Sequence, residues 1–360
     1  MRIAKLLQNL ASLRRLAASF AFLVSCGAIA ASTVVAGPQD KRLDIYWIDV
    51  EGGAATLLVT PAGETILIDA GNPGRRDADR IVQVLTQVAG RRQIDHLVTT
   101  HFHGDHYGGA VMLSGLVPIK TVYDNGDFEG LRDRPDASYW KFPCEKRVVI
   151  QPGDQIPLKQ LDQAGSPPIA IKCLGTRQTF IPAVAGVEPN ANVCADAREK
   201  DRDGSDNANS VVLLASFGNW RFFDAGDLTW NQESRLVCPH NLVGTVDVYQ
   251  VTHHGLDASN NPLVLRSLQP RVAVMNNGVT KGCMPEVFES LQKTKSLQAI
   301  YQVHKNLRDD GKTNNVPDEY IANRERECQG HYVRLSVAPD AKTYTVAIPA
   351  NKHERTFETK

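Results

Sequence analysis

Four side chains that can bind metal follow one predicted strand within six residues, and this feature constrains the fold most. The segment 94–100 is apolar and β-branched, which predicts a buried strand. Directly after it the chain reads H-x-H-x-D-H, with His101, His103, Asp105 and His106. A turn at a strand end can aim these groups into one small volume, where imidazole and carboxylate suit divalent Zn, Mn or Fe. The alternative is a cluster of ordinary surface histidines, but three histidines and an aspartate at one strand end argue against it.

The spacing of these ligands predicts two ions. His101 and His103 are two residues apart and can bind one ion, while Asp105 and His106 can bind a neighbouring ion. We therefore expect two divalent metal ions as cofactors. Zinc is the first expectation, and manganese and iron are the alternatives.

The chain around the motif predicts an α/β domain. An antiparallel meander is expected from strands at 43–50, 54–60 and 65–68, which are separated by glycine-containing turns. Residues 77–88 carry apolar side chains at the spacing of an amphipathic helix, and Gly90 suits its C-terminal end. Strand, helix and strand therefore alternate after the meander, which indicates a layered α/β sandwich.

The second half of the chain repeats this arrangement. Strands are expected at 210–216, 220–223 and 247–252, and two of them end at acidic or histidine residues. We expect residues 43–350 to form a single domain of two similar halves with the site between them. Two irregular stretches, 124–146 and 176–206, are interpreted as loops that border the site.

The first 36 residues resemble an export signal. Arg14 and Arg15 precede an apolar run from Leu16 to Ala31, and small residues follow. The sequence around Cys26 also resembles a lipoprotein signal, and an uncleaved anchor is a further alternative. We expect an exported protein, periplasmic or secreted, that contacts the membrane only through a lipid on Cys26 or an uncleaved leader.

Charge and cysteine content agree with this interpretation. Residues 37–360 carry 36 basic and 40 acidic residues, so this part is mildly acidic and is not expected to bind nucleic acid sequence-specifically. The expected partner is a small-molecule or phosphoester substrate. Six cysteines remain after Cys26, an even number that permits three disulfides in an oxidising compartment.

The histidine motif resembles the signature of the metallo-β-lactamase superfamily, and three other motifs match it in order: Leu67–Gly71 before the histidines, and Asp224–Asp227 and Thr252–Gly255 after them. This resemblance implies a four-layer αββα sandwich and a metal-dependent hydrolase. It implies that Asp69 orients a ligand, that Asp227 bridges two metals, and that His253 or His254 is the last histidine ligand. His253 is preferred as the ligand because it directly follows a strand, and His254 then supports a ligand from behind or acts as a general acid.

Within the superfamily, the chain looks most similar to the hydrolase domain of the ComEC family of competence proteins. The turn Asp49–Ala55 and the stretch Asp206–Val212 are similar to motifs of that family. The resemblance covers roughly residues 43–280. ComEC proteins carry many membrane spans, whereas this sequence has none after its leader, so it is not expected to be a DNA channel.

One departure from the superfamily concerns the first metal site. A third histidine is usual before the strand that begins near Ser210, but no histidine lies between His106 and His240. The expected substitute is Asp206, and Asn207 and Asn209 are the second choices. Oxygen ligands there would favour Mn over Zn.

These inferences predict an exported metal-dependent hydrolase that uses a metal-bound hydroxide on a phosphoester or phosphodiester. Asp105, His254 and Asp69 are the predicted catalytic residues. The predicted metal ligands are His101, His103, Asp105, His106, Asp206, Asp227 and His253. A β-lactam or lactone hydrolase of the same fold and a non-catalytic metal-bound binding module are the alternatives.

Overall fold

The structure, a computed structural model, describes residues 39–360. The predicted export signal at 1–36, including Cys26, lies outside the described residues. Within 39–360, no helix is long and apolar enough to cross a membrane.

The first sheet has nine strands and joins the beginning of the domain to its end. Its strands run in the order β18-β17-β16-β1-β2-β3-β4-β5-β6 and are antiparallel from β18 to β3 and parallel from β3 to β6. Their bounds are β1 (Leu43–Trp47), β2 (Thr56–Val59), β3 (Thr65–Ile68), β4 (Ile94–Val98), β5 (Ile119–Asp124), β6 (Lys146–Val149), β16 (Val333–Val337), β17 (Thr343–Ile348) and β18 (His353–Glu358). Because β18 pairs with β17, the paired sheet continues past residue 350, the predicted end of the domain.

The second sheet also has nine strands, in the order β15-β14-β13-β12-β11-β10-β8-β7, with β9 paired to β8. The strands from β11 to β15 are parallel. Their bounds are β7 (Gln155–Ile156), β8 (Ile169–Thr176), β9 (Thr179–Phe180), β10 (Val212–Phe217), β11 (Trp220–Asp224), β12 (Val248–Gln250), β13 (Val272–Met275), β14 (Ala299–His304) and β15 (Ile321–Asn323).

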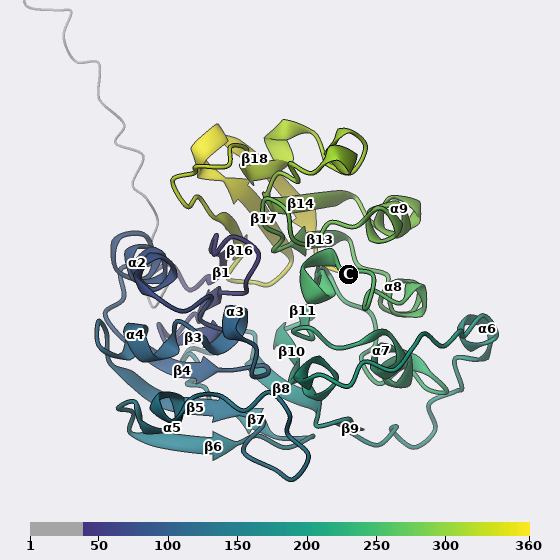
Figure 1. Ribbon diagram of the computed structural model, residues 1–360, viewed down its shortest axis with the longest axis horizontal. Helices are drawn as coiled ribbons and strands as arrows, with labels where there is room; N and C mark the ends of the chain where they lie inside the picture. The colour runs from purple at the N-terminus through teal and green to yellow at the C-terminus, as the bar shows by residue number, and fades with distance from the viewer. Residues whose placement is uncertain (1–38) are drawn as a thin grey trace, which may run out of the picture. The chain divides into compact units, whose positions relative to one another are not determined.

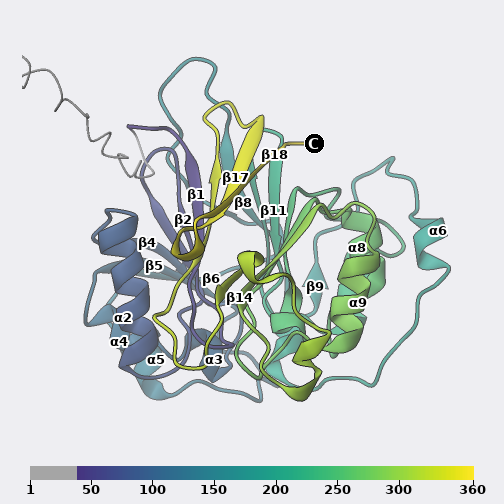
Figure 2. The ribbon, with the colours of Figure 1, turned by 90° about the horizontal axis from the view of Figure 1, so that it is seen from above.

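Helices cover the outer face of each sheet. In Figures 1 and 2, α2 (Arg75–Gln83), α4 (Ala110–Ser114) and α5 (Ala137–Lys141) lie outside the first sheet, and the helices of the second half lie outside the second. That second group is α7 (Trp230–Val237), α8 (Pro262–Leu268) and α9 (Pro285–Lys293). The short helix α3 (Gly104–Tyr107) follows β4, and α6 (Ala191–Cys194) lies in the long connection before β10. The expected four-layer αββα sandwich is confirmed.

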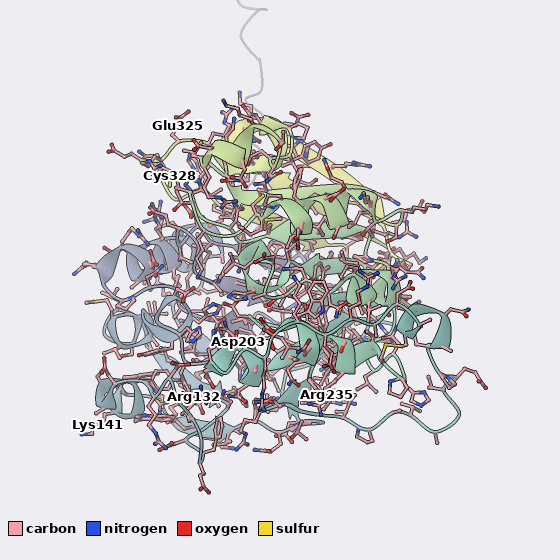
Figure 3. All side chains as sticks on the ribbon, turned by 45° about the vertical axis from the view of Figure 1, so that its right-hand side comes forward. Arg132, Lys141, Asp203, Arg235, Glu325 and Cys328 are labelled. Atoms are coloured by element: carbon pink, nitrogen blue, oxygen red, sulfur yellow. A yellow bond between two sulfur atoms is a disulfide. The ribbon has the colours of Figure 1, made fainter. Side chains whose placement is uncertain are left out.

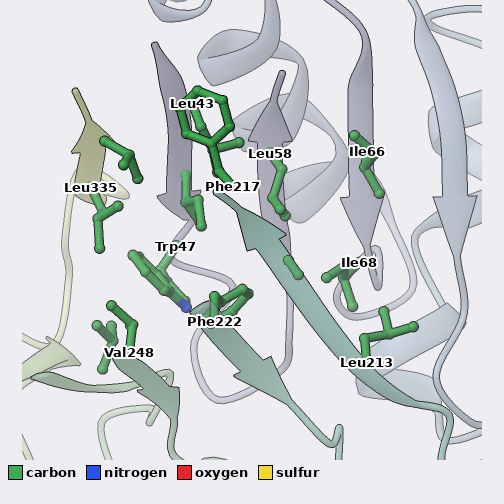
Figure 4. Close-up of a cluster of buried hydrophobic side chains, with 14 of the residues drawn as sticks. Leu43, Trp47, Leu58, Ile66, Ile68, Leu213, Phe217, Phe222, Val248 and Leu335 are labelled. Atoms are coloured by element: carbon green, nitrogen blue, oxygen red, sulfur yellow. The ribbon is translucent and has the colours of Figure 1, made fainter. Parts of the chain in front are cut away.

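Strand periodicity explains the layers. Alternate residues of a strand face opposite sides, so Leu43, Ile45 and Trp47 of β1 pack between the two sheets while Tyr46 packs towards the helices. Figure 4 shows Trp47 beside Phe222 of the second sheet, and their ring centroids are 5.6 Å apart in an edge-to-face contact. This layer holds the halves together and brings the ends of strands from both sheets to one site.

The cysteines are only partly paired. Cys194 of α6 forms a disulfide with Cys238, which ends α7, and this ties the long connection 176–206 to the second helical layer. The other four cysteines of the described chain are free thiols: Cys144, Cys173, Cys283 and Cys328. The three disulfides that the cysteine count permits are therefore not found in this part of the chain.

Candidate metal centre

Strands of both sheets end at the predicted site. Asp69 follows β3, the histidine motif follows β4, Asp227 follows β11, and the pair His253-His254 follows β12. Neighbouring parallel strands end at the same sheet edge, which brings these residues together. In Figure 1, α3, which carries Asp105 and His106, lies between the blue first half and the green second half.

Four side chains meet in one compact group. Ligand atoms of Asp105, His106, Asp227 and His254 all lie within 4.8 Å of one another. The Nε2 atom of His106 lies 3.2 Å from Nε2 of His254 and 3.2 Å from Asp227 Oδ2. Two imidazoles and two carboxylates are a common ligand set for a divalent ion of the Zn, Mn or Fe type. We call these four residues the inner group.

The ring nitrogens that face away from the inner group have partners of their own. Nδ1 of His106 lies 2.7 Å from Asp69 Oδ2, and Nδ1 of His254 lies 3.2 Å from the carbonyl oxygen of Asn276. A proton on each Nδ1 satisfies these acceptors and leaves a lone pair on each Nε2, the tautomer that binds metal. Two lone pairs that face each other at 3.2 Å repel unless a cation lies between them, so the inner group fits a bound metal ion.

Asp69 lies behind the ligands, as the resemblance implies. Its carboxylate accepts hydrogen bonds from the backbone N–H of Thr100 at 2.8 Å and from the Thr100 hydroxyl at 2.7 Å, besides its contact with His106. These bonds hold the carboxylate in one orientation, so Asp69 is a positioning residue for His106 rather than a ligand.

The first metal position is less complete. His101 is fully buried, and its Nε2, which lies 3.9 Å from Asp227 Oδ2, has no hydrogen-bond partner. His103 turns outwards, and its Nε2 lies 3.2 Å from Asp133 Oδ2 in the 124–146 loop. The structure therefore brings His101 to Asp227 and leaves His103 at the mouth of the site.

Asp206 does not supply the missing ligand. Its Oδ2 accepts the N–H of Phe102 at 2.7 Å, and its Oδ1 accepts the side-chain amide of Asn209 at 3.0 Å. The expectation that Asp206 replaces the absent histidine is corrected accordingly, because Oδ2 holds the loop that carries the histidine motif and Oδ1 holds Asn209. Asn207 lies closer to the centre: its Nδ2 is 3.5 Å from His253 Nε2, and its buried Oδ1 has no hydrogen-bond partner.

The His-His pair is placed differently from the sequence preference. Both residues have left-handed backbone angles, with φ of 53° at His253 and 55° at His254. This tight turn directs His254 into the inner group, with Nε2 3.3 Å from Asp105 Oδ2. His253 faces Asp227 Oδ2 at 3.3 Å from the side of Asn207. His254, rather than the preferred His253, therefore completes the inner group.

Burial and charge shift the pKa values of the cluster strongly. Burial disfavours a charge on His106, but the carboxylates of Asp227 and Asp69 outweigh it and raise the pKa of His106 well above its ordinary value. Burial also opposes ionisation of Asp227, yet the surrounding histidines, His106 first, hold its pKa well below the usual range. Burial and the neighbouring His106 lower the pKa of His101 well below its ordinary value. The two carboxylates of the inner group thus favour positive charge between them, from protons on His106 and His254 or from a bound cation.

The centre opens to solvent on one side. The side chains of His103 and Asp105 are 27% and 21% exposed, whereas those of His101, His106, Asp227 and His254 are 0–2% exposed. Lys281 contacts Asp105 on this side. The loops 124–146 and 176–206 meet nearby, since Asp133 accepts the N–H of Asp206 at 2.8 Å. Figure 3 labels Arg132 and Asp203 on these two loops, which the sequence predicted to border the site.

Two residues near the centre were not predicted from the sequence as part of the site. Asp133 holds His103, and Lys281 contacts Asp105. Both lie on irregular segments without a recognisable motif, and only the tertiary structure brings them to the histidine motif. The position of Lys281, shortly after β13, was the one available signal.

Comparison with known proteins agrees with this fold. Residues 48–169, about a third of the chain, match the family model of the metallo-β-lactamase superfamily. The matched segment contains the histidine motif and the 124–146 loop. No match was found among curated proteins.

Among the similar solved structures are three of low identity. The metallo-β-lactamase fold protein YhfI from Bacillus subtilis is 10% identical, with a TM-score of 0.44 over 72% of this chain and 96% of its own. CmlA, a diiron β-hydroxylase from Streptomyces venezuelae, is 15% identical, with a TM-score of 0.39 over 66% of this chain and 45% of its own. The subclass B3 metallo-β-lactamase MEM-A1, from a soil metagenome library, is 15% identical, with a TM-score of 0.34 over 72% of this chain and 75% of its own. TM-scores below 0.5 do not indicate a shared substrate. The fold itself, two sheets between two helical layers, is the metallo-β-lactamase fold.

Proposed function

We propose that this chain, part of which matches the metallo-β-lactamase superfamily, is a metal-dependent hydrolase of phosphoesters or phosphodiesters. The observation that carries the proposal is the pair of imidazole Nε2 atoms of His106 and His254, which face each other at 3.2 Å beside two carboxylates. Their outer nitrogens are already occupied by Asp69 and Asn276. In an ordinary buried histidine pair, two ring nitrogens without protons would not be expected to face each other.

The residues divide into two metal positions. The inner group would hold one ion, and His101, His103 and His253 would hold the other; Oδ2 of Asp227 faces His101 and His253 as well as the inner group. Bound divalent ions would supply Lewis acidity, which makes water more acidic and stabilises negative charge on a substrate. Zinc is the first proposal for the metal, with manganese or iron as alternatives.

The chain's own residues would position the reaction. Asp69 holds His106 in one tautomer, and Asp227 lies between the two positions, so it would fix their separation. The most exposed histidine and carboxylate of the centre are His103 and Asp105. Substrate would therefore approach from the side of these two residues.

A positive charge at the opening favours an anionic substrate. Lys281 is 37% exposed and contacts Asp105, so a phosphoester oxygen that entered here would meet an ammonium group. The likeness to the ComEC hydrolase domain points to the same substrate class, and it rests on the sequence motifs alone.

The direct test uses purified protein without residues 1–36. Bound metal is measured by elemental analysis, and hydrolysis is assayed on a phosphodiester, a phosphomonoester, a β-lactam and a lactone, with and without chelator. We expect about two ions per chain and chelator-sensitive turnover of the phosphoesters. Asp105→Asn should lose turnover, while His240→Ala, outside the centre, should not. Lys281→Met should raise KM for the phosphoester more than for the neutral lactone.

Other outcomes would select another function. Turnover of the β-lactam or lactone alone would identify a hydrolase of that class. Tight ligand binding without turnover would indicate a binding module. A chain that takes up neither Zn nor Mn would contradict the proposal.

We also propose that the protein is exported, periplasmic or secreted, with Cys26 as a site of lipid attachment if the leader is a lipoprotein signal. The disulfide Cys194–Cys238 supports an oxidising compartment. Fractionation of cells that express the wild type or Cys26→Ser tests this: retention in the cytoplasm would contradict export, and release of the variant from the membrane would identify the lipid anchor.

A further inference from the structure

A second group of potential ligands lies outside the metal centre and shares no residue with it. Asp49 follows β1 of the first sheet, His304 ends β14 of the second, and Cys328 lies in the loop after β15. A carboxylate oxygen, a ring nitrogen and the sulfur of these residues all lie within 4.8 Å of one another. We call this set the Asp-His-Cys group.

His304 contributes a ring nitrogen to the group, and one of its two ring nitrogens is unused. The side chain is 0% exposed, and its Nε2 has no hydrogen-bond partner. Its Nδ1 lies 3.3 Å from the carbonyl oxygen of Lys305, which favours the proton on Nδ1 and leaves the lone pair on Nε2. A buried ring nitrogen without a partner costs free energy unless a proton donor or a metal occupies it.

Asp49 and Cys328 complete a donor set of oxygen, nitrogen and sulfur. Asp49 is fully buried, and the Cys328 thiol donates to its Oδ2 at 2.9 Å. Cys328 is half-buried and lines a surface cavity of about 200 Å³ together with Glu325 and His331, so ions can reach it. Figure 3 shows Cys328 and Glu325 on the same outer loop.

The charges around the Asp-His-Cys group favour the binding of a cation. Arg80 donates to Asp49 Oδ2 at 3.2 Å and pairs with Glu51 at 3.2 Å, and Arg76 pairs with Glu51 at 2.7 Å. Once the thiol loses its proton, three negative groups face two guanidinium groups. The excess negative charge is then available to a metal ion.

We propose that Asp49, His304 and Cys328 form a second metal site that binds Zn²⁺ through one oxygen, one nitrogen and one sulfur atom. A sulfur, an imidazole and a carboxylate are ligands that Zn²⁺ takes, and a water from the cavity would fill a fourth position. On binding, the S–H bond of Cys328 breaks, its proton passes to the buffer, and a sulfur–metal bond forms. Because Asp49 and His304 belong to different sheets, the ion would also join the two halves of the domain.

The test exploits the sulfur, since the donors of the main centre are nitrogen and oxygen only. Co²⁺ is titrated into the metal-free purified protein under argon, and the near-ultraviolet thiolate-to-Co²⁺ charge-transfer absorption is recorded. We expect this absorption to appear and to saturate when one sulfur-bound Co²⁺ is present per chain, in addition to the ions that the main centre takes up. Cys328→Ser should abolish it, whereas Cys144→Ser, which removes another half-buried thiol, should leave it unchanged.

Two further measurements separate this proposal from its alternatives. His106→Ala disrupts the main centre, so the absorption should persist in that variant even if the proposed hydrolase function fails. Zn²⁺ should slow alkylation of Cys328 at least about tenfold in the wild type and have no such effect in His304→Gln. The proposal is overturned if Co²⁺ produces no absorption, if the absorption survives Cys328→Ser, or if Zn²⁺ does not protect the thiol.

Discussion

Single hydrogen bonds decide which nitrogen of each histidine faces the metal centre. Asp69 accepts from His106 and from both the backbone and the hydroxyl of Thr100. A carboxylate held in this way fixes the ring orientation and raises the basicity of the ligand nitrogen. The effect of Asp69 on metal binding is therefore expected to exceed its effect on stability.

We expect Asp69→Asn to lower metal affinity about 10–100-fold, the cost that is typical for such a partner. The affinity is measured by competition with a chromophoric chelator. Asp95→Asn is a matched control, because Asp95 accepts the N–H and hydroxyl of Thr65 in the same sheet but contacts no ligand of the centre. Equal loss of affinity in both variants would show that Asp69 acts only through stability.

At this scale the sequence predicted the ligands that a local motif contains and missed those that depend on distant contacts. The spacing of His101–His106 was sufficient to place four candidate side chains at one strand end. Asp206 was misassigned because offset from a strand says nothing about which donors its carboxylate meets. The order of His253 and His254 depended on two left-handed residues, which the sequence pattern does not reveal.

Among the elements, the turn Thr252–Gly255 carries the strictest steric requirement. Gly282 has a φ of 79°, and a Cβ there would lie 1.9 Å from the carbonyl oxygen of His254. The next residue, Cys283, donates its N–H to that same oxygen at 3.0 Å. The segment after β13 therefore holds the His-His turn in place only if residue 282 has no side chain.

Gly282→Ala should displace this turn, reduce metal content and lower the free energy of unfolding. Its control is Gly153→Ala, where φ is 98° but no atom lies within 4 Å of the new Cβ. The control should lower the free energy of unfolding by only about 1–2 kcal/mol, the cost of left-handed backbone strain. Denaturant unfolding and elemental analysis measure both effects. The steric explanation fails if the two variants lose equal stability and both keep their metal.

Glu233 of helix α7 makes the free energy of unfolding depend on pH, and it is not one of the proposed metal ligands. Burial raises the pKa of Glu233 to about 8 from an ordinary 4.5, while its Oε2 accepts the N–H of Asn261 at 2.7 Å. The stabilisation from the protonated form is fully present below pH 4.5 and is lost as the pH rises through about 8. Glu233→Gln keeps the acceptor and cannot ionise.

The unfolding free energy of the wild type should therefore fall relative to Glu233→Gln between pH 4.5 and 8. The expected difference is on the order of a few kcal/mol. Denaturant titrations across this range measure it, with the exposed Glu289→Gln as control. A difference that does not change with pH would mean that Glu233 is ionised in the folded state.

Strands and long helices were the elements that the sequence predicted well. Apolar alternation and helical spacing report directly on which face is buried, and the helix expected at 77–88 is found as α2 and the helical turn Val84–Val88 that continues it. The loops 124–146 and 176–206 contain the short helices α5 and α6, which have too few residues for a periodic pattern.

At the scale of the described domain, a shared polar contact joins the facing sides of the two sheets. Trp47 Nε1 and Thr56 Oγ1 of the first sheet both donate to Gln250 Oε1 of the second, at 2.7 and 2.9 Å. All three side chains are buried. Because the metal centre takes residues from both sheets, it depends on this interface.

Gln250→Leu should leave two buried donors without an acceptor, at a cost of about 1–3 kcal/mol each. Adding Trp47→Phe removes one of these donors, so the double variant should lose less than the sum of the single losses. Tryptophan fluorescence and far-UV circular dichroism follow unfolding, and the two transitions should coincide if the halves unfold together. Additive losses would contradict the shared contact.

The layer order was predictable, but the partner strands at the ends of the first sheet were not. That β16 pairs with β1 depends on contacts between residues nearly the whole domain apart, for which local pattern carries no signal.

This pairing has a consequence for synthesis on the ribosome. Strand β1 is among the first parts of the domain to emerge, yet its neighbour β16 begins at Val333 and emerges almost last. Until then, the nascent chain exposes an apolar strand edge that can pair with other chains. Fragments that stop before β16 should therefore accumulate as aggregates, whereas chains that include β16 should not aggregate.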